Sequence, residues 1–402
     1  MLHVQITRVE GIRVVMPIEA PILTCYGALQ GYTRTIIKVH TTDGIVGIGE
    51  THGSVTPARL DALGKAIAGL SPWEVGRIRQ RLNNLNYYSK DEQAVAGIEI
   101  ACLDAVGRAT GKPLHDLLGG KLRDEVEAAA YLFFRNANGE GEGKVATAEE
   151  MAAEAERWCT KYGYTTVKLK GGILRPEEEL EALRLTADVV GPRAKLRIDP
   201  QGGWTIPTAL TIGRAMEALP MEYLEDPVWD MQAMATVRGQ VRIPLATNMC
   251  VTRFEHLGPA VAVRPVDVIL SDIWYWGGMH ATQALDTVAE RLGFGLGMHA
   301  NGELGIGLAA MLHMASVMPH LKAAIDVMHP HAVDDLVVGA SARPVNGMYT
   351  VPDGPGLGVD LDENKLEEYA AYATRPEALD RLTTPTLADP ARPGWYADLP
   401  VF

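Results

Sequence analysis

The sequence predicts an α/β fold in which a (β/α)8 barrel carries an α+β domain at its N-terminal end. Strand and helix patterns alternate from residue 126 onward, which implies a parallel sheet. Five successive strand-like runs then each end in one polar residue. These residues are Asp199, Glu225, Asn248, Asp272 and His299. Counted from Lys170 by subtraction, the steps are 29, 26, 23, 24 and 27 residues, about one strand–helix unit each.

The first 55 residues alternate between apolar and polar positions, as antiparallel strands do. Runs 35–40 and 45–49 flank Asp43-Gly44, a strong hairpin signal. Between the first two strands a loop is expected over 20–32, because this stretch contains one proline and two glycines. Amphipathic helices are expected next, over 56–70, 72–85 and 91–109. This part of the chain is therefore α+β.

Eight barrel strands are expected, over 126–133, 166–170, 195–199, 221–225, 243–248, 267–272, 294–299 and 323–327. We assign 1–124 to a capping domain and 125–353 to the barrel. Segment 354–402 is expected to run back over the first domain and complete it, ending at 393–395. An open doubly wound sheet is the alternative, but its Gly-x-Gly-x-x-Gly signature is missing after the first strand.

Composition excludes several classes of function. The chain has 402 residues and a net charge of −13, which argues against a nucleic-acid or anionic-membrane surface. Its four cysteines form no Cys-x-x-Cys pair and are expected to be free thiols in a reducing compartment. The N-terminus lacks a signal-peptide core, and no run reaches about 18 apolar residues. We expect a cytoplasmic protein without membrane partners.

Lys168 and Lys170 lie two residues apart on one strand and hence on one face. If that face points into a barrel, each buried ammonium needs a partner or a task. Like charges also make each lysine easier to deprotonate, which is one way to obtain a base near neutral pH. The alternative is a strand with two lysines on a solvent face.

Asp199, Glu225 and Asn248 end three consecutive strands and supply three hard oxygen donors side by side. Such a set suits Mg²⁺, whereas the lack of a cysteine in the set, with only one histidine nearby, argues against zinc. Taken singly, each could instead cap the following helix. Asp272 and His299 end adjacent strands, where a carboxylate would fix the imidazole tautomer and raise its basicity. A base on each side of a metal suits removal of the proton α to a carboxylate.

These residues carry a resemblance to the enolase superfamily. The chain resembles the branch that includes mandelate racemase and muconate lactonizing enzyme, and most closely the acid sugar dehydratases such as glucarate dehydratase. The matching motifs are Lys168-Leu-Lys170-Gly-Gly, Asp199-Pro-Gln-Gly-Gly-Trp204, Glu225-Asp226-Pro227, Ala-Thr-Asn248-Met and His299-Ala-Asn301. An amide as third metal ligand is found in glucarate dehydratase and not in most of the superfamily. The resemblance extends over nearly the whole chain and implies a modified (β/α)7β, TIM-type barrel.

By this resemblance, Lys170 is the base, Lys168 tunes its pKa, and Asp272–His299 is the opposite dyad. The resemblance makes five residues candidate substrate contacts: Asn301, Asp326, Tyr131, Thr33 and Gln201. It implies Mg²⁺-dependent dehydration of an acid sugar to a 2-keto-3-deoxy acid, and a homo-oligomer. Racemisation or epimerisation with the same residues is the first alternative, and a catalytically silent binding barrel is the second.

The substrate itself is left open by the sequence. Gln201 replaces the asparagine of the family, and the loop around 27–31 lacks the substrate-contacting histidine of glucarate dehydratase. Region 50–54 is expected to shape specificity. His329 and His331 are expected in an exposed loop, and the aromatic run 274–276 is expected either to line the pocket or to pack at the barrel rim.

Overall fold

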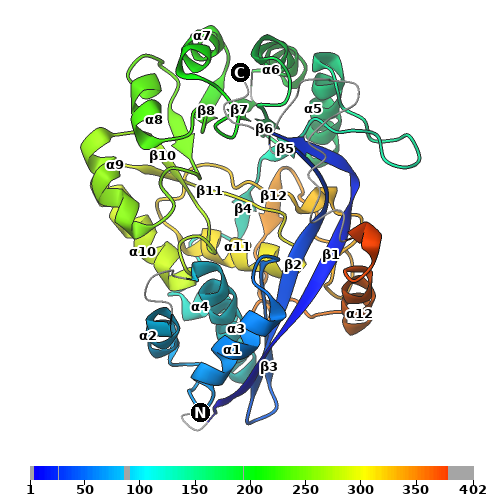
Figure 1. Cartoon of the computed structure of the whole chain (residues 1–402), viewed down its shortest axis with the longest axis vertical. Helices are drawn as coiled ribbons and strands as arrows, with labels where there is room; N and C mark the ends of the chain where they lie inside the picture. Colours follow the sequence, from blue (N-terminus) through cyan, green and yellow to red (C-terminus); the bar gives the residue numbers. More distant parts are fainter. Residues whose placement is uncertain (1–3, 26, 86–90, 193, 379–402) are drawn as a thin grey trace.

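The computed structural model describes residues 4–25, 27–85, 91–192 and 194–378 (Figure 1). An antiparallel sheet with flanking helices stands beside a strand–helix barrel. The sheet has the order β1-β2-β3, with strands β1 (Ile6–Thr24), β2 (Gly27–Thr41) and β3 (Val46–His52). The predicted hairpin between β2 and β3 is confirmed, with His40 opposite Val46 and Gly44 at a φ of 85° in the turn.

The loop predicted over 20–32 is wrong. β1 runs to Thr24, and pairing with β2 continues through Leu23 opposite Ala28 after a register shift between Pro17 and Ile22. Pro21 falls within this register shift, and Gly27 and Gly31 lie in β2, so they form a bulge and strand positions instead of a loop. The apolar side chains of Ile22 and Leu23 between them are buried. β1 and β2 therefore continue past the end of β3 as a two-stranded ribbon, here called the β1–β2 ribbon.

Three helices cover the sheet at nearly the predicted places: α1 (Pro57–Ile67), α2 (Val75–Leu85) and α3 (Glu92–Thr110). Thr56 caps α1 by accepting a hydrogen bond from the Arg59 N–H, and Gly111 ends α3 in the left-handed region at φ 66°. α3 packs closely against β3, since a Cβ added at Gly47 or Gly49 would collide with the backbone of α3.

The barrel sheet has seven parallel strands in the order β11-β10-β9-β8-β7-β6-β5. They are β5 (Ala130–Leu132), β6 (Thr166–Lys170), β7 (Lys195–Asp199), β8 (Met221–Glu225), β9 (Leu245–Thr247), β10 (Val268–Ser271) and β11 (Gly295–Met298). The short helix α4 (Leu114–Leu117) follows α3 and lies beside it. The helices of the barrel part are α5 (Ala148–Tyr162), α6 (Pro176–Val190), α7 (Ile206–Met216), α8 (Met231–Arg238), α9 (Leu257–Val263), α10 (Met279–Leu292) and α11 (Gly305–Val317), with short turns η1 (Phe254–His256) and η2 (His329–His331). Figure 1 shows α5–α10 around the outside of the strands.

Two of the eight predicted strands differ from the observed ones. Strand 126–133 is divided into β4 (Glu125–Glu127), which pairs with β12 (Met348–Thr350), and β5. Segment 323–327 is not a regular strand but still connects β11, at one edge of the sheet, with β4 and with Ala129, the residue before β5 at the other edge. The Asp326 N–H donates to the Met298 carbonyl at 2.9 Å, and the Ile325 N–H donates to the Glu127 carbonyl at 2.8 Å. The predicted fold class, an α/β barrel with an α+β capping part, is confirmed.

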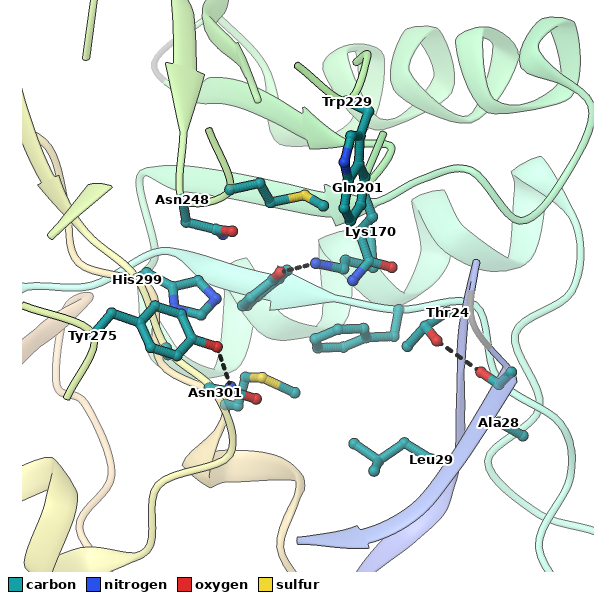
Figure 2. Close-up of a pocket in the computed structure, with 16 residues that line it drawn as sticks. Thr24, Ala28, Leu29, Lys170, Gln201, Trp229, Asn248, Tyr275, His299 and Asn301 are labelled. Atoms are coloured by element: carbon teal, nitrogen blue, oxygen red, sulfur yellow. Dashed lines mark hydrogen bonds between the residues drawn. The ribbon is translucent and has the colours of Figure 1, made fainter. Parts of the chain in front are cut away.

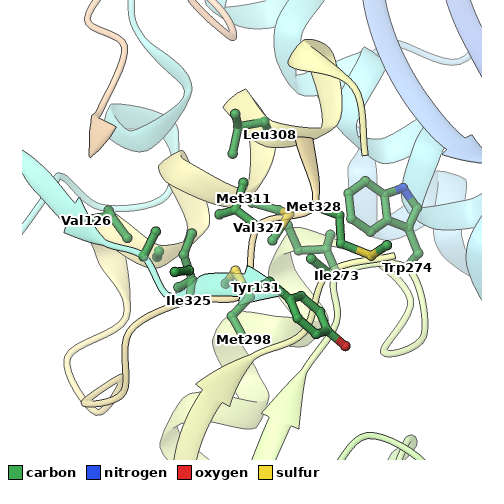
Figure 3. Close-up of a cluster of buried hydrophobic side chains, with 14 of the residues drawn as sticks. Val126, Tyr131, Ile273, Trp274, Met298, Leu308, Met311, Ile325, Val327 and Met328 are labelled. Atoms are coloured by element: carbon green, nitrogen blue, oxygen red, sulfur yellow. The ribbon is translucent and has the colours of Figure 1, made fainter. Parts of the chain in front are cut away.

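The largest core lies between the strands and α11, a helix whose thirteen residues are all buried. Figure 3 shows Leu308 and Met311 of α11 packed over Ile325 and Met298 at the closing edge of the barrel. A helix buried on every side is apolar nearly all round. The polar side chains of α11, His313 and Ser316, are each within hydrogen-bond distance of a backbone carbonyl. No helix within the described residues is both long and apolar enough to cross a membrane.

The chain after the barrel returns to the first sheet. Helix α12 (Glu363–Tyr372) packs against β1, and Lys38 Nζ donates to Glu363 at 2.6 Å. Residues 379–402, which include the predicted end at 393–395, lie outside the described residues.

Candidate active site

The two lysines of β6 point into the barrel. Lys168 is fully buried, and Lys170 is nearly so at 6% exposure. Lys170 lies directly opposite Asp199 in the parallel pairing of β6 with β7. The alternative of a solvent-facing lysine strand is therefore excluded. Their side chains also flank Tyr131, with Lys168 Nζ 4.4 Å and Lys170 Nζ 5.6 Å from the centre of its ring.

Each lysine is held by carboxylates at the strand ends. Lys170 Nζ donates to Asp199 Oδ2 at 2.5 Å and to the Tyr131 hydroxyl at 2.9 Å. Lys168 Nζ donates to Asp326 Oδ2 at 2.6 Å and lies 2.5 Å from Glu225 Oε2. Such charge-assisted contacts fix both ammonium groups in place.

The expectation that the lysine pair lowers both pKa values is wrong for Lys168. Burial lowers the pKa of Lys168, but the carboxylates of Asp326 and Glu225 raise it by more, so it ends above its ordinary value. The sequence could not show this result, because Glu225 and Asp326 lie 57 and 158 residues away by subtraction. Lys168 is therefore held as a cation.

Three oxygen donors meet beside these lysines. Asn248 Nδ2 donates to Glu225 Oε1 at 2.8 Å, which turns the amide oxygen of Asn248 the other way. Glu225 Oε2 is buried and accepts no hydrogen bond of good geometry from the described residues. Asp199 Oδ1 accepts from the Gln201 N–H at 2.9 Å. Two carboxylates and one amide are hard ligands of the kind Mg²⁺ prefers.

The charge around these donors also fits a cation. Burial, and next the charge of Asp199, raise the pKa of Glu225 well above its ordinary value. This is the result expected where buried carboxylates outnumber the cations around them. Within the described chain, no group of three His, Cys, Asp or Glu side chains is arranged to hold a metal ion. The candidate set here is of a different kind, because its third donor is an amide. Asp199, Glu225 and Asn248 could hold Mg²⁺.

Asp226 orients the third donor, a role that the sequence analysis missed. Its Oδ2 accepts from the Asn248 N–H at 2.8 Å, and its Oδ1 accepts from the Thr247 hydroxyl at 2.5 Å. Asp226 itself has a positive φ of 36°, an uncommon conformation for a residue other than glycine. The signal was present in the motif Glu225-Asp226-Pro227, where a second acid follows the strand end.

The predicted pair of Asp272 and His299 is brought together across β10 and β11. His299 Nδ1 lies 2.9 Å from Asp272 Oδ2, while Asp272 Oδ1 accepts from the N–H groups of Trp274 and Tyr275 at 2.8 and 3.0 Å. Burial raises the pKa of Asp272, but the hydrogen bond and the charge of His299, together with smaller contributions from His52 and the Tyr275 N–H, outweigh burial and hold that pKa below its ordinary value. An ionised Asp272 accepts a hydrogen bond from the Nδ1–H of His299, which leaves Nε2 as the reactive nitrogen.

A cavity of about 610 Å³ opens above these groups. Figure 2 shows His299 on one side, Lys170 on the other and Asn248 near the gap between them. Three of the predicted substrate contacts line the cavity as well, namely Tyr131, Gln201 and Asn301.

The other predicted site residues lie outside the lining. Lys168, Asp199, Glu225, Asp272 and Asp326 are buried and reach the cavity only through the residues that they hold. Thr33 does not line the cavity. It lies farther along β2, where its carbonyl accepts a hydrogen bond from the Gly53 N–H. Its place is taken by residues nearer the tip of the β1–β2 ribbon: Thr24, Gly27, Ala28 and Leu29.

Tyr275 is a lining residue that sequence reasoning placed only within the aromatic run 274–276. Its ring stacks against His299 with 5.9 Å between ring centres and 20° between the ring planes. Its hydroxyl oxygen accepts from Asn301 Nδ2 at 3.0 Å. Of the two tryptophans beside it, Trp274 is fully buried and donates to the Glu50 carbonyl at 2.6 Å. The aromatic run thus serves both roles that were expected of it.

Region 50–54 reaches the cavity through buried polar contacts. Glu50 accepts from Arg34 Nε at 2.7 Å and from the N–H groups of Leu304 and Gly307 at 2.9 and 2.8 Å, at the N-terminal end of α11. Arg34 Nη1 also donates to the Asn301 carbonyl at 3.3 Å. The first sheet therefore fixes the loop that carries Asn301.

The exposed loop expected for His329 and His331 is wrong, since both side chains are buried. His329 Nε2 lies 2.8 Å from Asp335 Oδ2, and His331 Nε2 lies 2.8 Å from the Tyr131 carbonyl. Each ring has a backbone or carboxylate partner that compensates its burial. They serve the structure beneath the cavity.

Comparison with known proteins agrees with this geometry. Residues 150–365 match the family described as enolase C-terminal domain-like, and residues 6–119 match the N-terminal domain of mandelate racemase / muconate lactonizing enzyme. A probable glucarate dehydratase of Streptomyces coelicolor is 36% identical, covering 94% of this chain and 96% of its own. A chloromuconate cycloisomerase of Cupriavidus pinatubonensis is 30% identical, covering 85% and 92%.

A solved structure extends the likeness to three dimensions. An enolase of Thermobispora bispora, complexed with magnesium and formate, is 37% identical with a TM-score of 0.86, covering 92% of this chain and 93% of that one. Matches of this length at these identities include both halves of the molecule and the strands that carry the candidate site. The chain belongs to the mandelate racemase / muconate lactonizing enzyme family of the enolase superfamily.

Proposed function

We propose that the protein is an Mg²⁺-dependent acid sugar dehydratase. The observation that carries this proposal is the placement of Lys170 and the Asp272–His299 pair around one cavity, with the oxygen donors of Asn248 and its neighbours between them. The first sheet acts as the cap in this proposal, because the tip of its β1–β2 ribbon lines the same cavity.

The metal would be held by Asp199, Glu225 and Asn248. When bound, it supplies positive charge next to the substrate carboxylate and so makes the neighbouring C–H bond more acidic. Lys168, buried and held as a cation, adds a second positive charge on the same side. These groups orient the acid with its α-carbon toward the cavity.

In the proposed reaction Lys170, as the neutral amine, removes the α-proton through Nζ and becomes an ammonium that Asp199 stabilises. The electron pair of the broken C–H bond first forms an enediolate of the substrate carboxylate. That pair then forms the bond between the α- and β-carbons as the β-hydroxyl leaves, or the α-carbon takes a proton back. His299, protonated at Nε2 and stabilised by Asp272, gives its proton to the departing oxygen, so that water is released. The enol that results becomes a 2-keto-3-deoxy acid.

A racemase or epimerase is the second candidate. It is favoured by the same two-sided arrangement, because a proton taken by Lys170 on one face could be replaced from His299 on the other. The relatives include a cycloisomerase as well as the probable dehydratase. Both candidates use proton transfer at the carbon next to a carboxylate.

The test is a panel of sugar acids incubated with the protein and Mg²⁺ in D₂O. Keto acid formation supports dehydration, and deuterium at the α-carbon without elimination supports the racemase or epimerase. We expect Lys170→Ala to abolish both signals. Lys195→Ala is the matched control, because Lys195 lies opposite Thr166 on the neighbouring strand but is exposed. Full activity of Lys170→Ala would contradict the proposal.

The metal ligands have a test that does not need turnover. Asn248→Ala removes one of three oxygen donors, and we expect Mg²⁺ affinity to fall by about 10- to 100-fold in a calorimetric titration. Equal affinity of the variant and the wild type would show that Asn248 holds no ion.

A further inference from the structure

The cavity has a reactive end and an end without charge. Lys170, His299 and Asn248 form the reactive end. Away from them the lining includes Ala28 and Leu29 of β2, Phe133 after β5, and Met328 after the closing segment. Figure 2 shows Leu29 and Ala28 on the ribbon, set apart from Lys170 and His299.

Apart from Lys170 and His299, no lysine, arginine or histidine lines the cavity in the described part of the chain. Lys170 is already paired with Asp199 at 2.5 Å. Arg34 comes near through the Asn301 carbonyl, but its charge is compensated by Glu50 at 2.7 Å in a fully buried ion pair. The uncharged end therefore has no cation to offer a ligand.

The buried groups around Asn301 do not supply a cation to the cavity either. His52 lies behind Asn301, with its Nδ1 3.5 Å from Asn301 Nδ2. Burial, and next the charge of Arg34, lower the pKa of His52 to about 3, so its ring is neutral at physiological pH. Glu303 is buried beneath Asn301 and accepts its N–H at 2.8 Å. As a carboxyl group, it adds no positive charge.

Polar contacts suited to hydroxyl groups are nevertheless present. The Tyr275 oxygen accepts from the Asn301 amide at 3.0 Å, which leaves its own O–H proton to donate into the cavity. Sugar hydroxyls can be recognised in this way, whereas a carboxylate moved out of water without a cation or several donors is costly.

We propose that the substrate is a monocarboxylic hydroxy acid whose far end is uncharged, and that six-carbon dicarboxylic acids are rejected because the cavity holds a cationic site at one end only. The proposal rests on the proposed function, since it places the reacting carboxylate beside Lys170. Leu29, on the uncharged wall, is then a residue that determines specificity.

Matched pairs of acids test this inference, each pair differing only in whether the terminal carbon is CH₂OH or COO⁻. Gluconate with glucarate and galactonate with galactarate are two such pairs. Deuterium exchange at the α-carbon and ligand-dependent thermal stabilisation are measured for each acid with Mg²⁺ present. For any pair that reacts, we expect the monocarboxylic acid to have a kcat/KM about 100-fold higher or more.

A charge-adding variant sharpens the test. Leu29→Arg places a cation on the uncharged wall and should shift the kcat/KM ratio toward the dicarboxylic acid by about 10-fold. Leu29→Met is the control, with a long neutral side chain that should leave the ratio unchanged. A ratio within one variant is insensitive to the folded fraction.

The outcomes separate the two proposals. If dicarboxylic acids exchange deuterium as fast as their partners in the wild type, this inference is wrong while the proposed function stands. If Leu29→Met shifts the ratio as much as Leu29→Arg, side-chain size and not charge decides specificity, and the inference is again wrong. If no acid of either kind exchanges deuterium or stabilises the protein, the proposed function fails and this inference fails with it.

Discussion

Asp272→Asn is the substitution that most directly tests how His299 works. The new amide would keep its oxygen toward the N–H groups of Trp274 and Tyr275, from which Asp272 Oδ1 accepts at 2.8 and 3.0 Å. Its NH₂ group would then face His299 Nδ1, which lies 2.9 Å from the present Oδ2. Because an NH₂ group donates, Nδ1 must accept, and the imidazole proton moves to Nε2.

The magnitude follows from the loss of one buried charge. A protonated His299 and an ionised Asp272 have charge centres roughly 4 Å apart, which is worth about 4 kcal/mol at the effective dielectric of proteins. With about 1.4 kcal/mol for each factor of ten, keto acid formation should slow by about 10³-fold. Proton removal by Lys170 does not pass through His299, so deuterium exchange at the α-carbon should fall by less than about tenfold.

The assay follows both signals on one acid in D₂O, by NMR for deuterium and by colour reaction for the keto acid. Asp335→Asn is the matched control, because Asp335 also binds a buried histidine, with 2.8 Å to His329 Nε2, and also accepts a backbone N–H, from Gly305 at 2.9 Å. Its site does not line the cavity. An equal loss of exchange and elimination in Asp272→Asn would refute the division of labour between Lys170 and His299.

Two further predictions concern stability and its dependence on pH. Glu50→Gln should lower the free energy of unfolding by about 3–5 kcal/mol, measured by urea denaturation, because Arg34 would be left buried without its counter-charge. Glu303→Gln should remove a pH dependence. Burial raises the pKa of Glu303 from 4.5 to about 7, so the folded protein keeps a proton that the unfolded chain releases, and wild-type stability falls as pH rises through that window, by about 3 kcal/mol.

Each of these predictions has its own control and its own contradiction. The exposed pair of Lys38 and Glu363 serves for Glu50→Gln, since Glu363→Gln should change stability by less than about 1 kcal/mol. Equal effects of the two variants would mean that the Arg34–Glu50 pair contributes no more than a surface pair. For Glu303→Gln, the difference in stability from wild type should grow in favour of the variant from pH 5 to pH 8. Parallel pH curves would show that Glu303 is not protonated in the folded state.

The reactive end of the site could be predicted because it follows from one regular feature. In a parallel barrel, the carboxyl ends of all strands meet at one face, so a polar residue at each strand end converges with the others. Only the period of the strand–helix repeat was needed to predict that Lys170, Asp199, Glu225, Asn248 and His299 lie together. The order of the strands then predicts which of these side chains are neighbours.

The sequence-based predictions were wrong where the surroundings of a side chain depend on other segments of the chain. The high pKa of Lys168 comes from Asp326 and Glu225, which no local pattern brings to it. His329 and His331 look like an exposed pair around a proline, yet Asp335 and the Tyr131 carbonyl compensate their burial. Three of these four partners come from distant segments of the chain, and Asp335 is six residues from His329 by subtraction. The immediate sequence neighbours of a polar residue therefore do not define its environment.

The uncharged end of the cavity was the least predictable part, for a physical reason. Leu29 and Ala28 reach the cavity only because β1 and β2 stay paired past the register shift at Pro17, and a register that differed by one residue would turn their side chains to the other face. The residues proposed to transfer protons are tied to the period of the barrel repeat. The residues proposed to select the substrate lie on a ribbon whose length and register depend on its packing. Relatives with the same strand-end residues can therefore act on different acids, and the charge of the ribbon-side wall is where this chain should differ from those that take a dicarboxylic acid.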